Sequence, residues 1–263
     1  MKSAPRIAVL TGYGLNCEKE TAYVFEKCGG IADLIHINDL INKEKSLAPY
    51  QIAAFIGGFS FGDHVASGRV LAIKFKYHLK EELLSFLKKD SLIIGICNGF
   101  QTLVKLGVLP GFQSELEQKV TLTHNEKIGY QDRWVKLRFN PQSSCVFTKG
   151  LDYLETPVRH GEGRFLIDNK ETLSLLEKNQ QIVCQYVHPE TNEPTQEFPY
   201  NPNGSIKSIA GICSPEGKIF GLMPHPEAFH SIYNHPRWTH MDIENYPLPL
   251  GLKIFQNAVN YFS

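Results

Sequence analysis

The chain has 263 residues, of which 42% are hydrophobic and 21% are charged, so it is long enough to bury a sizeable core. Lys and Arg together number 27, as do Asp and Glu, so no excess of basic charge favours nucleic acid or an anionic membrane as a partner. We find neither a signal-peptide pattern nor the roughly 20 consecutive apolar residues of a membrane helix. We therefore expect a soluble, cytoplasmic protein.

Strand-like apolar runs alternate with helical patterns in the first half of the chain, which predicts a mainly parallel sheet covered by helices. The expected strands are 6–10, 32–36, 53–56 and 92–96, and the expected helices are 18–28, 68–89 and the segment that ends at Leu106. The buried face of the 68–89 helix is predicted from residues at helical spacing, which are Val70, Ile73, Tyr77, Leu84 and Leu87.

The second half of the chain is richer in strands and turns. We expect strands at 134–139, 182–186 and 220–223, and helices at 172–178 and 252–262. The segment Pro189–Ser205 is polar and rich in Pro and Asn, which predicts a long surface loop or flap. No internal repeat or change of composition marks a linker, so a single domain over 1–263 is expected.

The six cysteines contain no C-x-x-C pair and predict reduced thiols, five of them small core residues. Cys97 differs, because Gly95-Ile96-Cys97-Asn98-Gly99 has the form G-x-C-x-G between a buried strand and a helix, the pattern of a nucleophile elbow. At a helix N-terminus the dipole favours thiolate, and the N–H of Asn98 is placed to receive an oxyanion. The alternative is a buried cysteine before an ordinary tight turn, and the strand-then-helix context favours the nucleophile.

A base for this thiol is predicted in Met223-Pro224-His225-Pro226-Glu227, which follows an apolar strand. Residues i and i+2 of an extended chain point to the same side, and Pro226 biases His225 towards the extended region. Glu227 would then hold one imidazole nitrogen while the other faces Cys97. Taken alone, H-P-E is also typical of a surface turn.

Two other patterns favour simpler interpretations. Histidines 225, 230, 235 and 240 recur every five residues, but such steps rotate by about 140° around a helix and do not share a face. We expect no metal site, although loops leave that geometry open. Gly12-Tyr13-Gly14 resembles the start of a dinucleotide-binding fingerprint, but Cys17 stands where its third glycine would be. The sequence also lacks a phosphate loop of the kind that binds ATP.

The glycine-rich stretch after the third strand, Ile56–Asp63, brings backbone N–H groups close to a ligand and can complete an oxyanion hole, or it is a plain strand-to-helix turn. With the elbow and H-P-E it belongs to a set of motifs that resembles the class I glutamine amidotransferases, and within them the glutaminase subunits of phosphoribosylformylglycinamidine synthases of purine biosynthesis. The motifs are GGFSFGD (57–63), GICNGFQ (95–101), RHGEGRF (159–165), NPNGS (201–205) and MPHPE (223–227).

The resemblance implies a flavodoxin-like three-layer α/β/α fold and a catalytic triad of Cys97, His225 and Glu227. It also implies that L-glutamine is held by Gly57, Gly58, Phe59, Asn98 and Gln101 and by backbone near His160, Gly161 and Glu162. Family members often carry Arg after the triad glutamate, where this chain has Ala228.

The resemblance further implies that the ammonia is used on a separate large synthase subunit, often joined by a small bridging subunit. This chain would need no cofactor, and ATP and Mg would bind to the synthase. Three alternatives stay open: a glutaminase that serves another biosynthetic synthase, a cysteine peptidase or stress chaperone on a similar elbow fold, and a scaffold with a relic site. The late H-P-E counts against the second, and the complete set of triad residues counts against the third.

Overall fold

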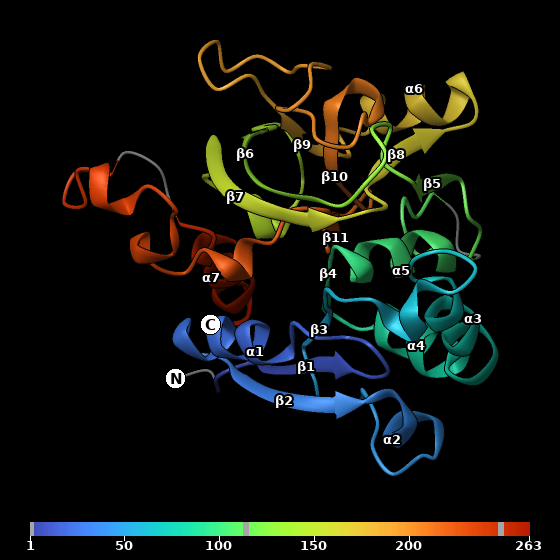
Figure 1. Ribbon diagram of the computed structural model, residues 1–263. Coiled ribbons are helices and arrows are strands. Elements are labelled where there is room, and N and C mark those ends of the chain that lie inside the picture. The colour runs from blue at the N-terminus through green and yellow to red at the C-terminus, as the bar shows by residue number, and fades with distance from the viewer. Residues whose placement is uncertain (1–2, 113–115, 247–249) are drawn as a thin grey trace.

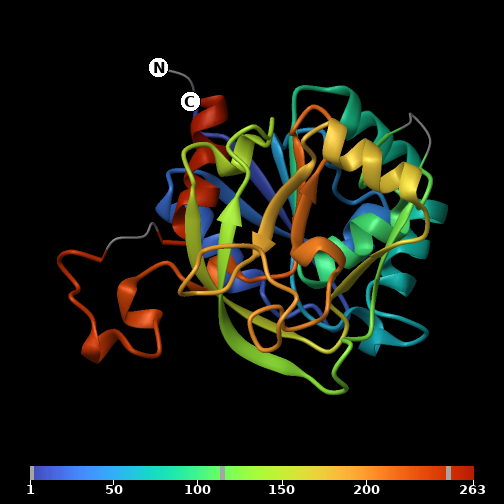
Figure 2. The same cartoon turned by 90° about the horizontal axis from the view of Figure 1, so that it is seen from above.

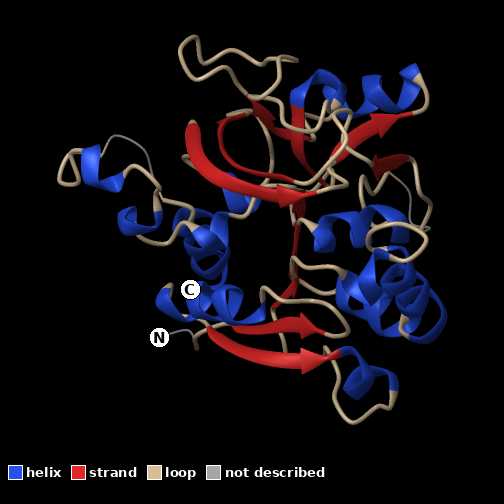
Figure 3. Ribbon diagram, in the orientation of Figure 1, coloured by secondary structure: helices blue, strands red, loops and turns tan. Residues whose placement is uncertain are grey.

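The computed structural model describes residues 3–112, 116–246 and 250–263 (Figure 1). Nine strands form one continuous sheet in the order β2-β1-β3-β4-β11-β10-β9-β6-β7, and β5 pairs with β8 separately. Figures 2 and 3 show how helices and loops surround these strands. Among the described residues no helix has both the length and the apolar character needed to cross a membrane.

One half of the large sheet is parallel. Its strands are β2 (Ile31–His36), β1 (Arg6–Thr11), β3 (Ile52–Phe55), β4 (Leu92–Ile96) and β11 (Ile219–Leu222). Strands β3 and β4 are buried at every position, as expected of strands covered on both faces. Helices α1 (Glu18–Lys27) and α7 (Leu252–Phe262) lie on one side of this half. Helices α3 (Arg69–His78), α4 (Lys80–Lys88) and α5 (Asn98–Leu106) lie on the other (Figure 1). The α/β three-layer prediction is confirmed.

The other half of the sheet is antiparallel. It consists of β10 (Ile209–Cys213), β9 (Ile182–Tyr186), β6 (Gln131–Phe139) and β7 (Tyr153–His160). The small sheet of β5 (Val120–Thr123) and β8 (Arg164–Ile167) and the helices α2 (Ile37–Ile41) and α6 (Lys170–Lys178) complete the fold. The patterns at 134–139, 182–186 and 220–223 predicted β6, β9 and β11, whereas β5, β7, β8 and β10 were not predicted.

The helix predicted over 68–89 is two helices, α3 (Arg69–His78) and α4 (Lys80–Lys88). The chain breaks at Leu79, whose backbone has φ −125° and ψ 16° and whose side chain is buried. The predicted face was also wrong, because Tyr77 is 78% exposed. The buried residues are Leu71, Ala72, Phe75, Leu83 and Phe86.

The segment Pro189–Ser205 is a surface loop only in its first part. Asn201, Asn203 and Ser205 are buried and hydrogen-bond to their surroundings, which corrects the prediction of a loop that is exposed throughout. The Nδ2 of Asn203 donates to the hydroxyl of Tyr186 at 3.1 Å, and the Oγ of Ser205 accepts from the N–H of Phe165 at 2.9 Å. The loop therefore ends as an internal support between β9 and β8.

Candidate active site

The three predicted catalytic and glycine-rich segments follow neighbouring strands of the parallel half. Strand β4 lies between β3 and β11, with Gly95 opposite Phe55 and Ile96 opposite Leu222. The carboxyl ends of adjacent parallel strands meet at one edge of a sheet, where α/β proteins bind their ligands. This topology brings Cys97, the Gly57 loop and His225 to the same edge.

Cys97 has the strained backbone of a nucleophile elbow. Its φ of 51° and ψ of −106° lie in a region that residues with a side chain rarely adopt, and α5 begins at the next residue. A Cβ on Gly95 would lie 2.5 Å from the Cδ1 of Leu103 and 3.0 Å from the carbonyl of Gly99, so the turn needs glycine there. The Sγ of Cys97 lies 3.7 Å from the carbonyl oxygen of Arg159.

His225 and Glu227 form a buried pair. The Nδ1 of His225 lies 2.6 Å from the Oε1 of Glu227, and the backbone N–H of His225 donates to the carbonyl of Pro157 at 2.8 Å. The two side chains are 3% and 1% exposed, so water does not weaken the contact. The sequence predicted this contact from an extended chain, but Glu227 lies in a 3-10 turn, Pro226–Ala228, that brings the carboxylate back to the ring.

The charges around His225 favour its protonated ring. Burial by itself would lower the pKa of His225, but the negative charge of Glu227 and the thiols of Cys97 and Cys17 outweigh burial and hold the pKa well above its ordinary value. The Nε2 of His225 is buried and has no hydrogen-bond partner among the described residues. A protonated ring with a free N–H beside a thiol suits an acid that must pass its proton to a bound molecule.

Cys17 was not predicted near the site. Its Sγ, a ring nitrogen of His225 and a carboxylate oxygen of Glu227 all lie within 4.8 Å of one another. Cysteine, histidine and glutamate are ligands that zinc accepts, and this group is the one such cluster within residues 3–112, 116–246 and 250–263. The sequence showed only a cysteine soon after the first strand, which carries no signal of contact with residue 225.

The Gly57 loop is fixed by the segment that follows β1. The N–H of Asn16 donates to the carbonyl of Gly57 at 3.3 Å, and the N–H of Phe59 donates to the carbonyl of Gly14 at 2.8 Å. Phe59 has therefore already used its donor. Of the two candidate donors in this loop, the N–H of Gly58 is the better placed to complete an oxyanion hole with that of Asn98, since the first N–H groups of a helix have no partner within it.

Gln101 connects the elbow helix to the turn after β7. Its Nε2 donates to the carbonyl of Glu162, and its Oε1 accepts from the Nδ2 of Asn98 at 3.2 Å. The same Nδ2 donates to Asp63 at 3.1 Å, and the carboxylate of Glu162 accepts from the N–H of Ser67 at 3.1 Å. These contacts place two carboxylates, Asp63 and Glu162, beside the elbow helix.

The ring of His160 packs against Gly163. It is buried beside Asn203, whose Nδ2 lies 3.5 Å from its Nε2, and burial lowers the pKa of His160 to about 3, so the ring is neutral. The carbonyls of His160 and Gly161 both accept from Asn125, at 2.9 and 3.0 Å. His160 thus supports the 160–163 turn, while a Cβ on Gly161 would meet nothing within 4 Å.

A cavity of about 260 Å³ opens onto His225. Its walls come from the segment after β1, the start of α1, the Gly57 loop, the turn before β6, β7 and the segment after β11. The lining residues are Asn16, Cys17, Glu20, Gly58, Phe59, Tyr130, Arg159 and His225. The cavity gives a small molecule access to the imidazole from the surface.

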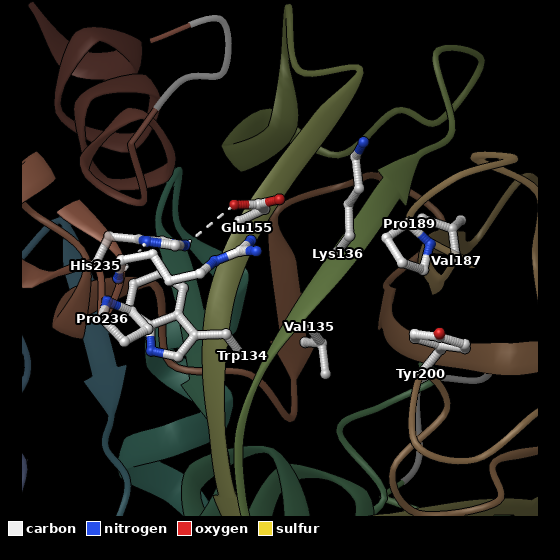
Figure 4. Close-up of a pocket in the computed structure, with 10 residues that line it drawn as sticks. Trp134, Val135, Lys136, Glu155, Val187, Pro189, Tyr200, His235 and Pro236 are labelled. Atoms are coloured by element: carbon white, nitrogen blue, oxygen red, sulfur yellow. Dashed lines mark hydrogen bonds and ion pairs between the residues drawn. The ribbon is translucent and has the colours of Figure 1, made fainter. Parts of the chain in front are cut away.

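A second cavity, of about 280 Å³, lies away from these residues between β6, β7 and the segment after the 3-10 turn (Figure 4). It is lined by Trp134, and the Nε2 of His235 pairs there with Glu155 at 3.3 Å. His230 instead packs edge-on against Tyr23. The histidines that repeat every five residues thus point to different surroundings and do not form a shared metal site among the described residues.

Comparison with known proteins identifies the family of this chain. Residues 4–262 match the family model of the CobB/CobQ-like glutamine amidotransferase domain, and the chain belongs to that family of glutamine amidotransferases.

Within the family, the chain is similar over its whole length to particular synthase subunits. It is 43% identical to phosphoribosylformylglycinamidine synthase subunit PurQ of Methanococcus maripaludis strain S2, covering 100% of this chain and 99% of the relative. It is also 43% identical to subunit PurQ of Dehalococcoides mccartyi strain 195, covering 98% of each. A chain of the PurLQS structure from Thermotoga maritima superposes with a TM-score of 0.73 at 26% identity, covering both chains fully. The predicted family resemblance is confirmed.

Proposed function

We propose that this protein is the glutaminase subunit of a phosphoribosylformylglycinamidine synthase, hydrolysing L-glutamine to glutamate and supplying the ammonia to the synthase. The observation that carries the proposal is that the strained Cys97 at the end of β4 and the buried His225–Glu227 pair after the neighbouring strand β11 lie at one edge of the sheet. The similarity to PurQ subunits over the whole chain supports the choice of synthase.

In the first half-reaction, the thiolate of Cys97 attacks the side-chain amide carbon of glutamine. The tetrahedral oxyanion accepts hydrogen bonds from the N–H groups of Asn98 and Gly58, and each such donor is worth about 3–4 kcal/mol in comparable sites. Protonated His225 gives its Nε2 proton to the amide nitrogen, the C–N bond breaks, and ammonia leaves. Cys97 is then acylated as a γ-glutamyl thioester.

In the second half-reaction, neutral His225 takes a proton from a water molecule, which attacks the thioester carbon. The thiolate of Cys97 leaves and glutamate is released, which restores the starting state. Glu227 acts through His225: it fixes the ring by its 2.6 Å contact with Nδ1 and stabilises the imidazolium that exists at the start of each cycle.

We place the amino-acid end of glutamine between the elbow helix and the 160–163 turn. Gln101 and the backbone of Gly161 and Glu162 border this region, and the carboxylates of Asp63 and Glu162 provide negative charge for the α-ammonium group. Gly57 acts by its backbone, and Phe59 lies against Tyr130 at the cavity wall, with ring centroids 6.1 Å apart.

The ammonia acceptor lies on another protein in this proposal. We expect a large synthase subunit that binds ATP and Mg and a small bridging subunit. Similarity to a chain of PurLQS supports a multi-subunit assembly. Because a loop-built oxyanion hole can be completed by docking of a partner, the isolated subunit is expected to hydrolyse glutamine poorly.

A coupled assay tests the proposal. The large and small synthase subunits, ATP, Mg and formylglycinamide ribonucleotide are combined with either glutamine or ammonium chloride. Product formation from glutamine should need this protein, whereas product formation from ammonium should not. If glutamine supports no product when the protein is added, although ammonium does, the assignment to this synthase is wrong. Vigorous glutamine hydrolysis that the synthase leaves unchanged would contradict activation by docking.

A further inference from the structure

Cys17 lies close to the His225–Glu227 pair but takes no part in the proposed hydrolysis steps. Its Sγ is within 4.8 Å of both His225 and Glu227. A Cβ built on Gly57 would lie 2.7 Å from the Cε1 of His225 and 3.0 Å from the Sγ of Cys17. The ring, the thiol and the backbone of Gly57 therefore meet with no spare room between them.

The orientation of the thiol follows from its neighbours. Cys17 is the residue before α1, and its carbonyl accepts from the N–H of Thr21 at 3.1 Å. Its Sγ lies 3.4 Å from the Oδ1 of Asn16, and since an amide oxygen only accepts, the S–H donates to it. This contact directs the hydrogen towards Asn16 and leaves the sulfur lone pairs for its other neighbours, of which the imidazole of His225 is one.

His225 needs support beyond Glu227. The contact with Oε1 is its one side-chain hydrogen bond among the described residues, and both its Nε2 and the Oε2 of Glu227 are buried without a partner. A ring held at one nitrogen can still tilt about that contact, and a small tilt moves Nε2 away from the substrate nitrogen. The wall formed by Cys17 and Gly57 opposes such a tilt, and a sulfur lone pair interacts favourably with a cationic ring.

We propose that Cys17 is a positioning residue of the glutaminase reaction, whose neutral thiol holds the protonated ring of His225 in the orientation that serves Cys97. The inference rests on the proposed function, because it takes His225 as the acid and base of glutamine hydrolysis. Burial raises the pKa of the Cys17 thiol, which fits a group that stays uncharged and does not compete with the nucleophile for the imidazolium.

The test compares Cys17→Ala with Cys28→Ala in the complete synthase complex. Cys28 is a matched control, because it is 7% exposed against 6% for Cys17, ends the same helix, and donates its S–H to the carbonyl of Leu252 at 3.7 Å, away from His225. Cys17→Ala should lower kcat for glutamine about tenfold, the lower end of the range for residues that orient functional groups. The KM should change less than about twofold, since Cys17 is not among the residues proposed to hold glutamine.

The pH profile separates positioning from general loss of stability. Removal of the sulfur removes one contribution that raises the pKa of His225, so the basic limb of kcat should move to lower pH in Cys17→Ala and stay in place in Cys28→Ala. Cys17→Ser keeps a lone pair and a donor for Asn16, and it should recover most of both effects.

Three outcomes would test the proposed role of Cys17 separately from the proposed function. Equal kcat and equal pH profiles for Cys17→Ala and Cys28→Ala would overturn the inference and leave the proposed function intact. Wild-type protein that releases no ammonia from glutamine in the complex would instead remove the proposed function. If Cys17→Ala is not recovered folded, Cys17→Val fills the space without a lone pair. It should show the same loss, and a wild-type pH profile in that variant would equally refute the inference.

Discussion

The two halves of the large sheet contribute to the site in different ways. The parallel half, from β2 to β11, presents the elbow, the Gly57 loop and the His225–Glu227 pair from three adjacent strand ends. The antiparallel half, from β10 to β7, contributes the turn at 160–163 and the carbonyls of Pro157 and Arg159, which contact His225 and Cys97. We infer that the first half supplies the reacting groups, while the second half holds them and shapes the substrate site.

The largest expected effect comes from the nucleophile in the parallel half. Cys97→Ser should lower kcat for glutamine by at least about 10⁴-fold, because the thioester can no longer form and loss of a nucleophile costs up to about 10⁶ in comparable enzymes. Ammonia release in the complex measures it, with Cys145→Ser as the control for a buried thiol. A Cys97→Ser protein that keeps a tenth of wild-type activity would rule out this nucleophile.

Glu227→Gln should cost on the order of 10³-fold in kcat, since the amide cannot stabilise the imidazolium of His225. The charge of Glu227 raises the pKa of His225, so its removal should also shift the basic limb of the pH profile to lower pH.

The raised pKa of His225 also makes the stability of the folded protein depend on pH. Because the pKa of His225 is higher in the folded than in the unfolded protein, its protonation stabilises the fold. This contribution is complete at pH values below the ordinary histidine pKa and is lost as the pH rises through the folded-state pKa. Denaturant unfolding at several pH values should show this loss in wild type and a weaker one in Glu227→Gln. If the pH dependence of kcat and of unfolding were the same in Glu227→Gln as in wild type, Glu227 would not be the group that raises the pKa of His225.

The contact between the Gly57 loop and the imidazole is expected to matter somewhat less. In Gly57→Ala the new methyl group would lie 2.7 Å from the Cε1 of His225, so the ring must move. A loss of about 10²-fold in kcat is expected, comparable to the removal of one oxyanion donor. Near-normal turnover in this variant would show that the imidazole of His225 does not contact the backbone of Gly57.

The smallest effect is expected where the two halves meet. Gln101→Ala removes the link from α5 to the carbonyl of Glu162, so the KM for glutamine should rise about tenfold with kcat little changed. A steady-state titration with glutamine measures both constants. A fall of kcat at constant KM would place Gln101 in the chemical step instead of in substrate binding.

The sequence predicted the catalytic segments of the parallel half well, because the patterns that mark them are local. Gly95, Cys97 and Gly99 describe the elbow within five residues, and His225 and Glu227 lie two apart. Strands β1, β3 and β4 of this half are also nearly continuous apolar runs.

The antiparallel half was harder to predict, because its contacts join distant segments. Strand β7 contains Pro157, which argues against a strand unless it lies at a sheet edge, and β7 is the edge strand. The placement of His160 depends on Asn203, 43 residues away. A contact of the same long-range kind, that of Cys17 with His225, was missed in the parallel half. Neither contact follows from a regular spacing of residues, so the sequence pattern does not predict it.

In the proposed reaction a single sulfur atom of this protein, that of Cys97, reacts with glutamine. Incubation with the glutamine analogue 6-diazo-5-oxo-norleucine, followed by peptide mass spectrometry, tests it directly in the synthase complex. We expect a single adduct on Cys97, absent when glutamine is in large excess, with Cys17 and the other four cysteines unmodified. Labelling of a different cysteine, or labelling of Cys97 that excess glutamine does not prevent, would contradict it.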